Sequence, residues 1–203
     1  MNFPIHSFPN DMVSHLTKEH KIAPQENIEA KKPQFNPYVF NAGTVCAIGG
    51  KGFVIVAGDT RLSQGYSIIS RENSKLCKLS DNVYLATSGM YADFVALSKQ
   101  LQSRLQMYQY NNQKQASMKA ISTLLSRTLY YKRYIYFIIN FINKYIYRFF
   151  PYYTFNLLAG FDNQGNGQVI GYDAVGSGDF KQYAVLGSGA QLIVPIFDQI
   201  FEG

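Results

Sequence analysis

Short apolar runs alternate with polar turns from Tyr38 to about residue 87. Two such runs enclose Gly49-Gly50-Lys51-Gly52 and predict an antiparallel hairpin, and two more enclose Ser80-Asp81-Asn82 and predict a second one. Strands are expected at residues 44–48, 53–57, 66–70, 75–79 and 83–87. Because these runs are apolar on both faces, we expect the sheets to be covered on both sides.

In the middle of the chain the apolar period changes to three and four residues, the spacing of one face of a helix. Two helices are predicted, with faces made of Phe94, Leu97, Leu101, Leu105 and Tyr108, and of Ile121, Leu124, Leu125, Thr128 and Leu129. Strands follow at residues 154–161, 168–172 and 180–186, and a last helix at residues 190–201. Strand blocks around a helical pair predict an α+β domain with helices packed on sheets.

Residues 1–36 are polar, rich in proline and without an apolar period. We expect a leader or propeptide-like arm there, followed by one domain at residues 37–203. All three histidines, His6, His15 and His20, lie in the arm. A Ser-His-Asp or Cys-His mechanism within the domain is therefore not expected. A zinc site made of these histidines is the alternative, but in a polar arm we expect them to be solvated.

Residues 134–148 depart from the pattern and read YIYFIINFINKYIYR. The segment is too short for a spanning helix and carries Asn140, Asn143 and Lys144, so we expect no membrane anchor. Nearly all of its residues can be written with AT-rich codons, and the codons around its two ends can hold the donor and acceptor dinucleotides of an intron. One hypothesis is a translated intron of 15 residues. The alternative is a genuine insertion between the second helix and the next strand.

The net charge of +6 is spread along the chain, and the longest basic cluster is Lys132-Arg133. We therefore expect no nucleic-acid partner. Cys46 and Cys77 lie in apolar runs without Cys-x-x-Cys spacing, which predicts two buried reduced thiols and a cytosolic or nuclear setting. Residues 1–20 lack the basic start and apolar core of a secretory signal. The sequence predicts neither a cofactor nor a bound metal.

The strongest chemical signal is the junction Gly43-Thr44, which is followed by the motif Asp59-Thr60-Arg61. This arrangement is typical of self-processing N-terminal threonine hydrolases. Such an enzyme needs a hydroxyl on the first residue of the mature chain, whose free α-amine acts as the base. It also needs a buried lysine near the hydroxyl and a carboxylate that holds the lysine.

From about Pro37 to its end, outside the odd segment, the chain resembles the beta subunits of the 20S proteasome core particle. The resemblance is carried by Gly43-Thr44, residues 57–61, Gly65, Lys75, Ser88-Gly89, Ala92-Asp93 and Gly187-Ser188-Gly189. The chain is most similar to the beta type 1 class, at the sixth position of the beta ring, over residues 35–41, 59–68 and 148–153. The resemblance implies a four-layer αββα sandwich of the N-terminal-nucleophile hydrolase type. Family members continue beyond a helix like that at 190–201, which implies a C-terminally incomplete chain.

In catalytic members of this family, the nucleophilic threonine lies 16 residues before the aspartate and the lysine 16 residues after it. Lys75 has this spacing from Asp59, but the position 16 residues before Asp59 is Gly43, and Thr44 comes one residue late. If the turn after the first strand is one residue shorter, Thr44 regains the working position as the nucleophile. If the strand is ungapped, the site has no nucleophile, because a one-residue shift turns a strand side chain to the opposite face.

The ungapped alignment is favoured and predicts a vestigial site without a catalytic residue, made of Gly43, Asp59, Arg61, Lys75 and Ser188. Asp59 and Lys75 are expected to remain a pair, because a buried lysine without a carboxylate is costly. Arg61 is expected to anchor a loop by hydrogen bonds. Ser188 matches a serine near the threonine amine of active subunits, although Gly-Ser-Gly is by itself an ordinary turn.

The resemblance implies a non-catalytic structural subunit that is not an enzyme on its own but belongs to a threonine-type endopeptidase complex. Its partners would be other alpha and beta subunits in stacked heptameric rings, and unfolded polypeptides would reach the chamber. The particle would act in ATP- and ubiquitin-dependent protein degradation in the cytoplasm and nucleus. The alternative is an active endopeptidase with Thr44 as its nucleophile.

Overall fold

The computed structural model describes residues 38–41, 43–132, 134–137, 146–149 and 151–201. All of them belong to the second of the chain's two units, which runs from Tyr38 to Gly203. The three histidines and the predicted arm lie outside the described residues.

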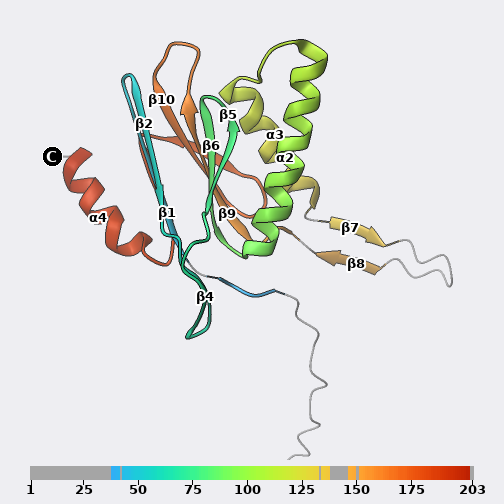
Figure 1. The fold of residues 1–203 in the computed structure, drawn as a ribbon, viewed down its shortest axis with the longest axis vertical. Helices are drawn as coiled ribbons and strands as arrows, with labels where there is room; N and C mark the ends of the chain where they lie inside the picture. The colour runs from blue at the N-terminus through green and yellow to red at the C-terminus, as the bar shows by residue number, and fades with distance from the viewer. Residues whose placement is uncertain (1–37, 42, 133, 138–145, 150, 202–203) are drawn as a thin grey trace, which may run out of the picture. The chain divides into compact units, whose positions relative to one another are not determined.

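Two antiparallel sheets form the centre of this unit (Figure 1). The larger sheet has five strands in the order β11-β10-β9-β6-β5, and the smaller has three in the order β12-β1-β2. The larger sheet consists of β5 (Leu76–Ser80), β6 (Val83–Gly89), β9 (Thr154–Phe161), β10 (Gly167–Tyr172) and β11 (Gly178–Lys181). The smaller sheet consists of β1 (Thr44–Gly50), β2 (Phe53–Gly58) and β12 (Tyr183–Gly187).

Helices lie on the outer faces of the two sheets. Figure 1 shows α2 (Tyr91–Asn112) and α3 (Met118–Lys132) beside the larger sheet, and α4 (Ala190–Phe201) beside the smaller one. On α4, the rings of Phe197 and Phe201 lie 5.4 and 5.1 Å from the ring of Tyr183 on β12. The layers therefore follow the order helix, sheet, sheet, helices, which confirms the expected αββα sandwich.

Two apolar cores hold these layers together. Under α2 and α3, the helix-spaced side chains Leu97, Leu101, Ile121, Leu125 and Leu129 are fully buried. Burial of each contributes about 1.5–3 kcal/mol relative to exposure. The core between the sheets is rich in small side chains, which lets the sheets approach closely, and includes Ala47, Ala86, Ala159 and Ala184.

Most of the predicted elements are confirmed, including both hairpins, the two central helices, the strand at 154–161 and the last helix. The single strand predicted at 180–186 is wrong. The chain there forms β11 in the larger sheet and β12 in the smaller one, with a break at Gln182, whose carbonyl accepts a hydrogen bond from the Gly49 N–H at 2.8 Å. An apolar run cannot itself show which sheet each half joins.

Three further features of the structure differ from the sequence analysis. The strand β3 (Leu62–Gln64) was not predicted and pairs with β4 (Ser67–Ser70) around Gly65, whose positive φ of 57° suits glycine. Both cysteines are free but half-buried rather than buried. The smaller sheet is incompletely covered among the described residues, since Phe53 and Ile55 on β2 are 48% and 57% exposed.

The odd segment forms a two-stranded sheet of β7 (Tyr134–Phe137) and β8 (Ile146–Phe149), and residues 138–145 between them lie outside the described part. Tyr134 pairs with Phe149 in the ladder. Among the described residues, no helix has the length and apolar character needed to span a membrane.

Candidate functional site

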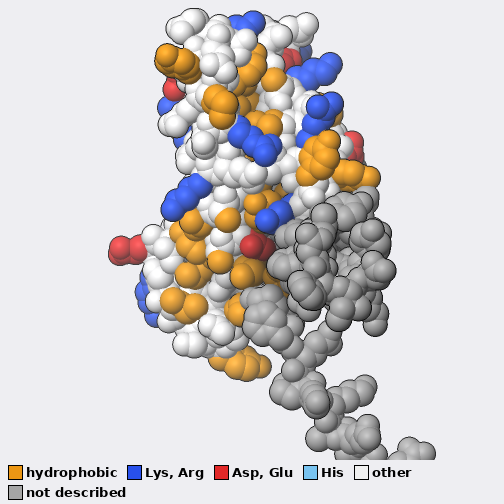
Figure 2. All heavy atoms as spheres, turned by 90° about the vertical axis from the view of Figure 1, so that its right-hand side faces the viewer, with side chains coloured by type: hydrophobic (Ala, Val, Ile, Leu, Met, Phe, Trp, Pro, Cys, Tyr) orange, Lys and Arg blue, Asp and Glu red, His pale blue; other side chains and the backbone are white. Residues whose placement is uncertain are grey.

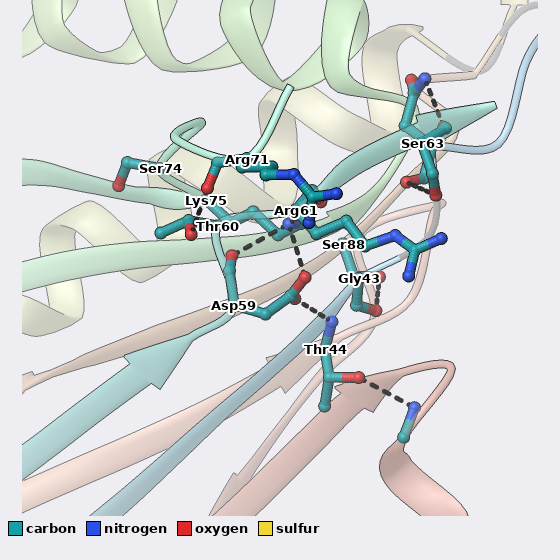
Figure 3. A network of polar contacts seen from close by, with 12 residues as sticks. Gly43, Thr44, Asp59, Thr60, Arg61, Ser63, Arg71, Ser74, Lys75 and Ser88 are labelled. Carbon is teal, nitrogen blue, oxygen red and sulfur yellow. Dashed lines mark hydrogen bonds and ion pairs between the residues drawn. The ribbon is translucent and has the colours of Figure 1, made fainter. Parts of the chain in front are cut away.

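Lys75 is the buried centre of the candidate site, directly before β5, with 4% of its surface exposed. Its ammonium donates to the carbonyl of Asp59 at 2.9 Å, to the Asp59 carboxylate at 3.1 Å and to the carbonyl of Arg61 at 2.6 Å. These acceptors lie just after β2, which ends at Gly58 (Figure 3). The three contacts use all three ammonium protons, so the buried charge is fully compensated.

Gly43 is the residue that faces this lysine. A Cβ added to Gly43 would lie 2.1 Å from Cε of Lys75 and 3.0 Å from its Nζ. The backbone of Gly43 has φ +104°, a region that residues with side chains rarely adopt. The lysine stem therefore occupies the space in which a side chain at position 43 would stand.

Thr44 begins β1 and makes its contacts on other sides of the site. Its N–H donates to a carboxylate oxygen of Asp59 at 2.7 Å, and its hydroxyl accepts a hydrogen bond from the Gly189 N–H at 2.9 Å. Figure 3 shows the hydroxyl directed away from Lys75. The hydroxyl therefore lies beside the turn before α4, and no contact of this hydroxyl with the lysine is found among the described residues.

The β1–β2 ladder sets this register. It runs without a bulge from Val45 opposite Gly58 to Gly50 opposite Phe53. A two-residue turn closes it, with Gly52 at φ +78°. Since successive residues on a strand point to opposite faces, the uninterrupted ladder explains why positions 43 and 44 differ in their neighbours.

The carbonyl of Gly43 is held from two directions. The hydroxyl of Ser88 donates to it at 3.0 Å, and the N–H of Ser188 donates at 3.1 Å. Ser88 is the second-last residue of β6 in the larger sheet, and Ser188 follows β12 in the smaller one, so this one carbonyl links the two sheets. The cavity lined by Lys75 and Ser88 measures only about 10 Å³, roughly the space of one water molecule.

The carboxyl pKa of Asp59 reflects opposing influences. Partial burial acts to raise the pKa, but the hydrogen bond from the Thr44 N–H and the contact with Lys75 act to lower it. The result is a pKa below the usual aspartate value, so Asp59 is ionised at neutral pH. Burial raises the pKa of the Cys46 thiol, which disfavours a reactive thiolate there.

The structure brings all five predicted site residues together, in roles that partly differ from those expected. Arg61 contributes its main-chain carbonyl, while its side chain is exposed. Ser188 likewise contributes its N–H rather than its hydroxyl. Ser88 and Gly189 were missed as site residues, although both belong to motifs that carried the resemblance. Within the described part of the chain, no group of three or more His, Cys, Asp or Glu side chains could hold a metal ion.

Comparison with known proteins identifies the family. The family model of the proteasome subunit matches residues 39–146 of the chain. This chain belongs to the proteasome subunit family. The αββα layers and the Gly-Thr junction at the start of β1 agree with this assignment, and the fold is the N-terminal-nucleophile hydrolase sandwich expected for a proteasome beta subunit.

Within this family, the chain is similar to beta type-1 subunits. It is 46% identical over 166 residues to proteasome subunit beta type-1 of Dictyostelium discoideum, an alignment that covers 81% of the chain and 64% of the relative. It is 46% identical over 164 residues to the Arabidopsis thaliana protein of the same name, covering 81% and 67%. The chain thus spans about two thirds of the length of these proteasome subunits.

Proposed function

We propose that this chain is a non-catalytic structural beta subunit of a 20S proteasome core particle. The observation that carries the proposal is that the residue facing Lys75 is Gly43, which has no side chain. An N-terminal threonine hydrolase needs a hydroxyl at that place, next to the lysine that favours its ionised form. Asp59 and Lys75 then serve as a structural pair.

The contacts of Thr44 support the same conclusion. Its hydroxyl is bound by the Gly189 N–H rather than placed beside Lys75. Its nitrogen donates to Asp59, in the geometry of a strand residue that continues from Gly43. A threonine in this position has no lysine to activate its hydroxyl, so cleavage at Gly43-Thr44 alone would not create a working site.

The proposed partners are other alpha and beta subunits, assembled in stacked heptameric rings. In such a particle this subunit would close a ring and wall the chamber in which neighbouring subunits cleave unfolded polypeptides, as part of ATP- and ubiquitin-dependent degradation. We propose a location in the cytoplasm and nucleus. Residues 1–36 would be an assembly propeptide or an arm that wraps a neighbouring subunit.

The test is to express the full chain with an affinity tag, isolate it by native purification and determine its size, its companions and its N-terminus by mass spectrometry. We expect comigration with a large particle that contains other proteasome subunits, and an N-terminus upstream of Thr44. A chain that remains a free monomer would overturn the assembly proposal.

The second candidate function is an active threonine endopeptidase with Thr44 as its nucleophile. The Gly43-Thr44 junction favours it, together with Asp59 and Lys75 in the place of the catalytic pair. A mature chain that begins at Thr44 and is covalently labelled there by a peptide vinyl sulfone, but not after Thr44→Ala, would establish it. Labelling that survives Thr44→Ala would point to a neighbouring subunit instead.

A further inference from the structure

The helical layer on the larger sheet carries a strong excess of positive charge. Helices α2 and α3 with their connecting turn contain six basic residues and a single acidic one, Asp93. The basic residues are all exposed: Lys99, Arg104, Lys114, Lys119, Arg127 and Lys132. Asp93 is turned toward the protein, where its carboxylate accepts the Tyr153 N–H at 2.9 Å.

These cations lack acidic partners in the described part of the chain. The ion pairs there are Lys75–Asp59 and Lys78–Asp81, and neither involves α2 or α3. Figure 2 looks onto this side of the protein and shows Lys and Arg side chains spread over it with hydrophobic side chains between them. The layer therefore presents an uncompensated positive field to solvent.

Apolar and aromatic side chains lie among these charges. Arg104 of α2 donates across to the Thr128 hydroxyl of α3 at 3.3 Å, which brings Arg104 close to the stretch that holds Arg127. On α2, Met107 follows Arg104 by one helical turn and is 60% exposed, and on α3, Tyr131 follows Arg127 by one turn and is 77% exposed. We name Arg104, Met107, Arg127 and Tyr131 the basic–aromatic patch.

This composition is that of a protein-binding surface. Arginine, tyrosine and methionine are enriched in protein interfaces, and arginine and tyrosine often supply much of the binding energy. A nucleic-acid surface instead needs closely spaced cations that follow a phosphate backbone, with one charge for about every 1.7 Å of duplex. The cations here are spread over two helices, and α2 alone is about 33 Å long at 1.5 Å per residue.

We infer that the basic–aromatic patch binds an acidic polypeptide segment that also carries aliphatic or aromatic side chains. The carboxylates of the segment would pair with Arg104 and Arg127, and its apolar side chains would cover Met107 and Tyr131. Planar guanidinium groups favour this pairing, because they bind carboxylates in a two-point geometry.

The test measures binding of the full chain to a fluorescent peptide of repeated Glu-Glu-Leu-Phe by anisotropy. We expect binding that weakens as NaCl rises from about 0.05 to about 0.3 M. The double variant Arg104→Glu/Arg127→Glu should weaken binding by about tenfold or more. The matched control Lys51→Glu/Lys181→Glu removes two exposed lysines elsewhere and should bind like the unmodified chain.

Two further probes separate the alternatives. A Gln-Gln-Leu-Phe peptide should bind much more weakly, and equal binding would overturn the role of charge. An oligonucleotide of equal charge that binds more tightly than the acidic peptide, and loses binding in the same double variant, would show a nucleic-acid surface instead. Unchanged peptide binding by that variant would also overturn the inference. If that variant fails to fold, Arg127→Gln/Tyr131→Ala answers the same question, with loss of binding expected.

Discussion

A single hydrogen atom stands at Gly43 where other residue types would place a Cβ 2.1 Å from Cε of Lys75. That absence lets the lysine stem pass through the site and reach the Asp59 carboxylate and two carbonyls. These contacts with Asp59 and Arg61 tie the loop after β2 to the start of β5. At this scale, one missing side chain leaves the space in front of Gly43 to the stem of Lys75.

Gly43→Ala should destabilise the chain by roughly 1–3 kcal/mol, because the new methyl group must displace Lys75 and the residue must keep a positive φ. The control is Gly52→Ala, which also has a positive φ but meets nothing within 4 Å. Chemical denaturation of both variants measures the difference. Equal losses of stability would show that Lys75 does not fill the space in front of Gly43.

Lys75→Met should lower the free energy of unfolding by about 3 kcal/mol, because the Asp59 carboxylate and the carbonyl of Arg61 lose their shared donor. Lys51→Met, in the exposed turn between β1 and β2, should cause little change. Thermal unfolding compares the two variants. A Lys75→Met chain as stable as the control would mean that the contacts of the lysine contribute nothing net.

The Asp59 carboxyl should make stability depend on acid. Because its pKa is lower in the folded chain than the usual value of about 3.9, its contribution is complete above that value and is lost as the pH falls through the folded pKa. We expect Asp59→Asn to be less stable than the unmodified chain at pH 7, with the gap closing at acid pH. Urea unfolding at several pH values measures it, with Asp179→Asn on the exposed β11 as control. A gap that stays constant with pH would refute the prediction.

At the scale of elements, local pattern predicted most helices and strands because each carries its own period. The face of α3 is an example, since burial on one side of a helix leaves a repeat of three and four residues in the sequence. The β1–β2 hairpin is another, since its glycine-rich turn separates two apolar runs. The division of residues 178–187 between β11 and β12 was missed, because sheet membership depends on partners distant in sequence. The β7–β8 pair was also missed. Its unusual composition set the segment apart in the sequence but did not indicate that its two ends pair as strands.

The segment 134–148 should be absent from the mature transcript if it is a translated intron. Tyr134 pairs with Phe149, so the backbone leaves and returns at neighbouring points, and removal of the segment would leave ends that can be joined. Sequencing of cDNA tests the hypothesis, and a chain without residues 134–148 should melt at the same temperature or higher. Transcripts that retain the segment would establish a genuine insertion.

At the scale of the whole molecule, apolar surface on the smaller sheet and its helix remains exposed. On α4, Leu192, Ile196 and Ile200 are 77%, 56% and 66% exposed, and their spacing of four residues places them on one face. The face is continuous along the helix, and exposed apolar patches of this kind favour association. The full chain on its own is therefore expected to aggregate.

Replacing Leu192, Ile196 and Ile200 by lysine should reduce aggregation of the isolated full chain, because it removes apolar surface without touching the contacts of Phe197 and Phe201. The control Gln191→Lys/Gln199→Lys adds charge to the same helix and leaves the apolar face intact. Light scattering during heating compares the variants. If both suppress aggregation equally, added charge rather than the apolar face is the cause.

The sequence alone determined most of the element types, the family resemblance and the five residues that meet at the site, because period and spacing are local properties of the chain. It left open whether Thr44 or Gly43 faces Lys75, since that depends on strand register, which is decided by pairing with β2 and β12. The tertiary structure also decided which polar atoms satisfy the lysine and which side chains of α2 and α3 form one surface. Such relations join residues far apart in sequence, and they arise only when the layers pack.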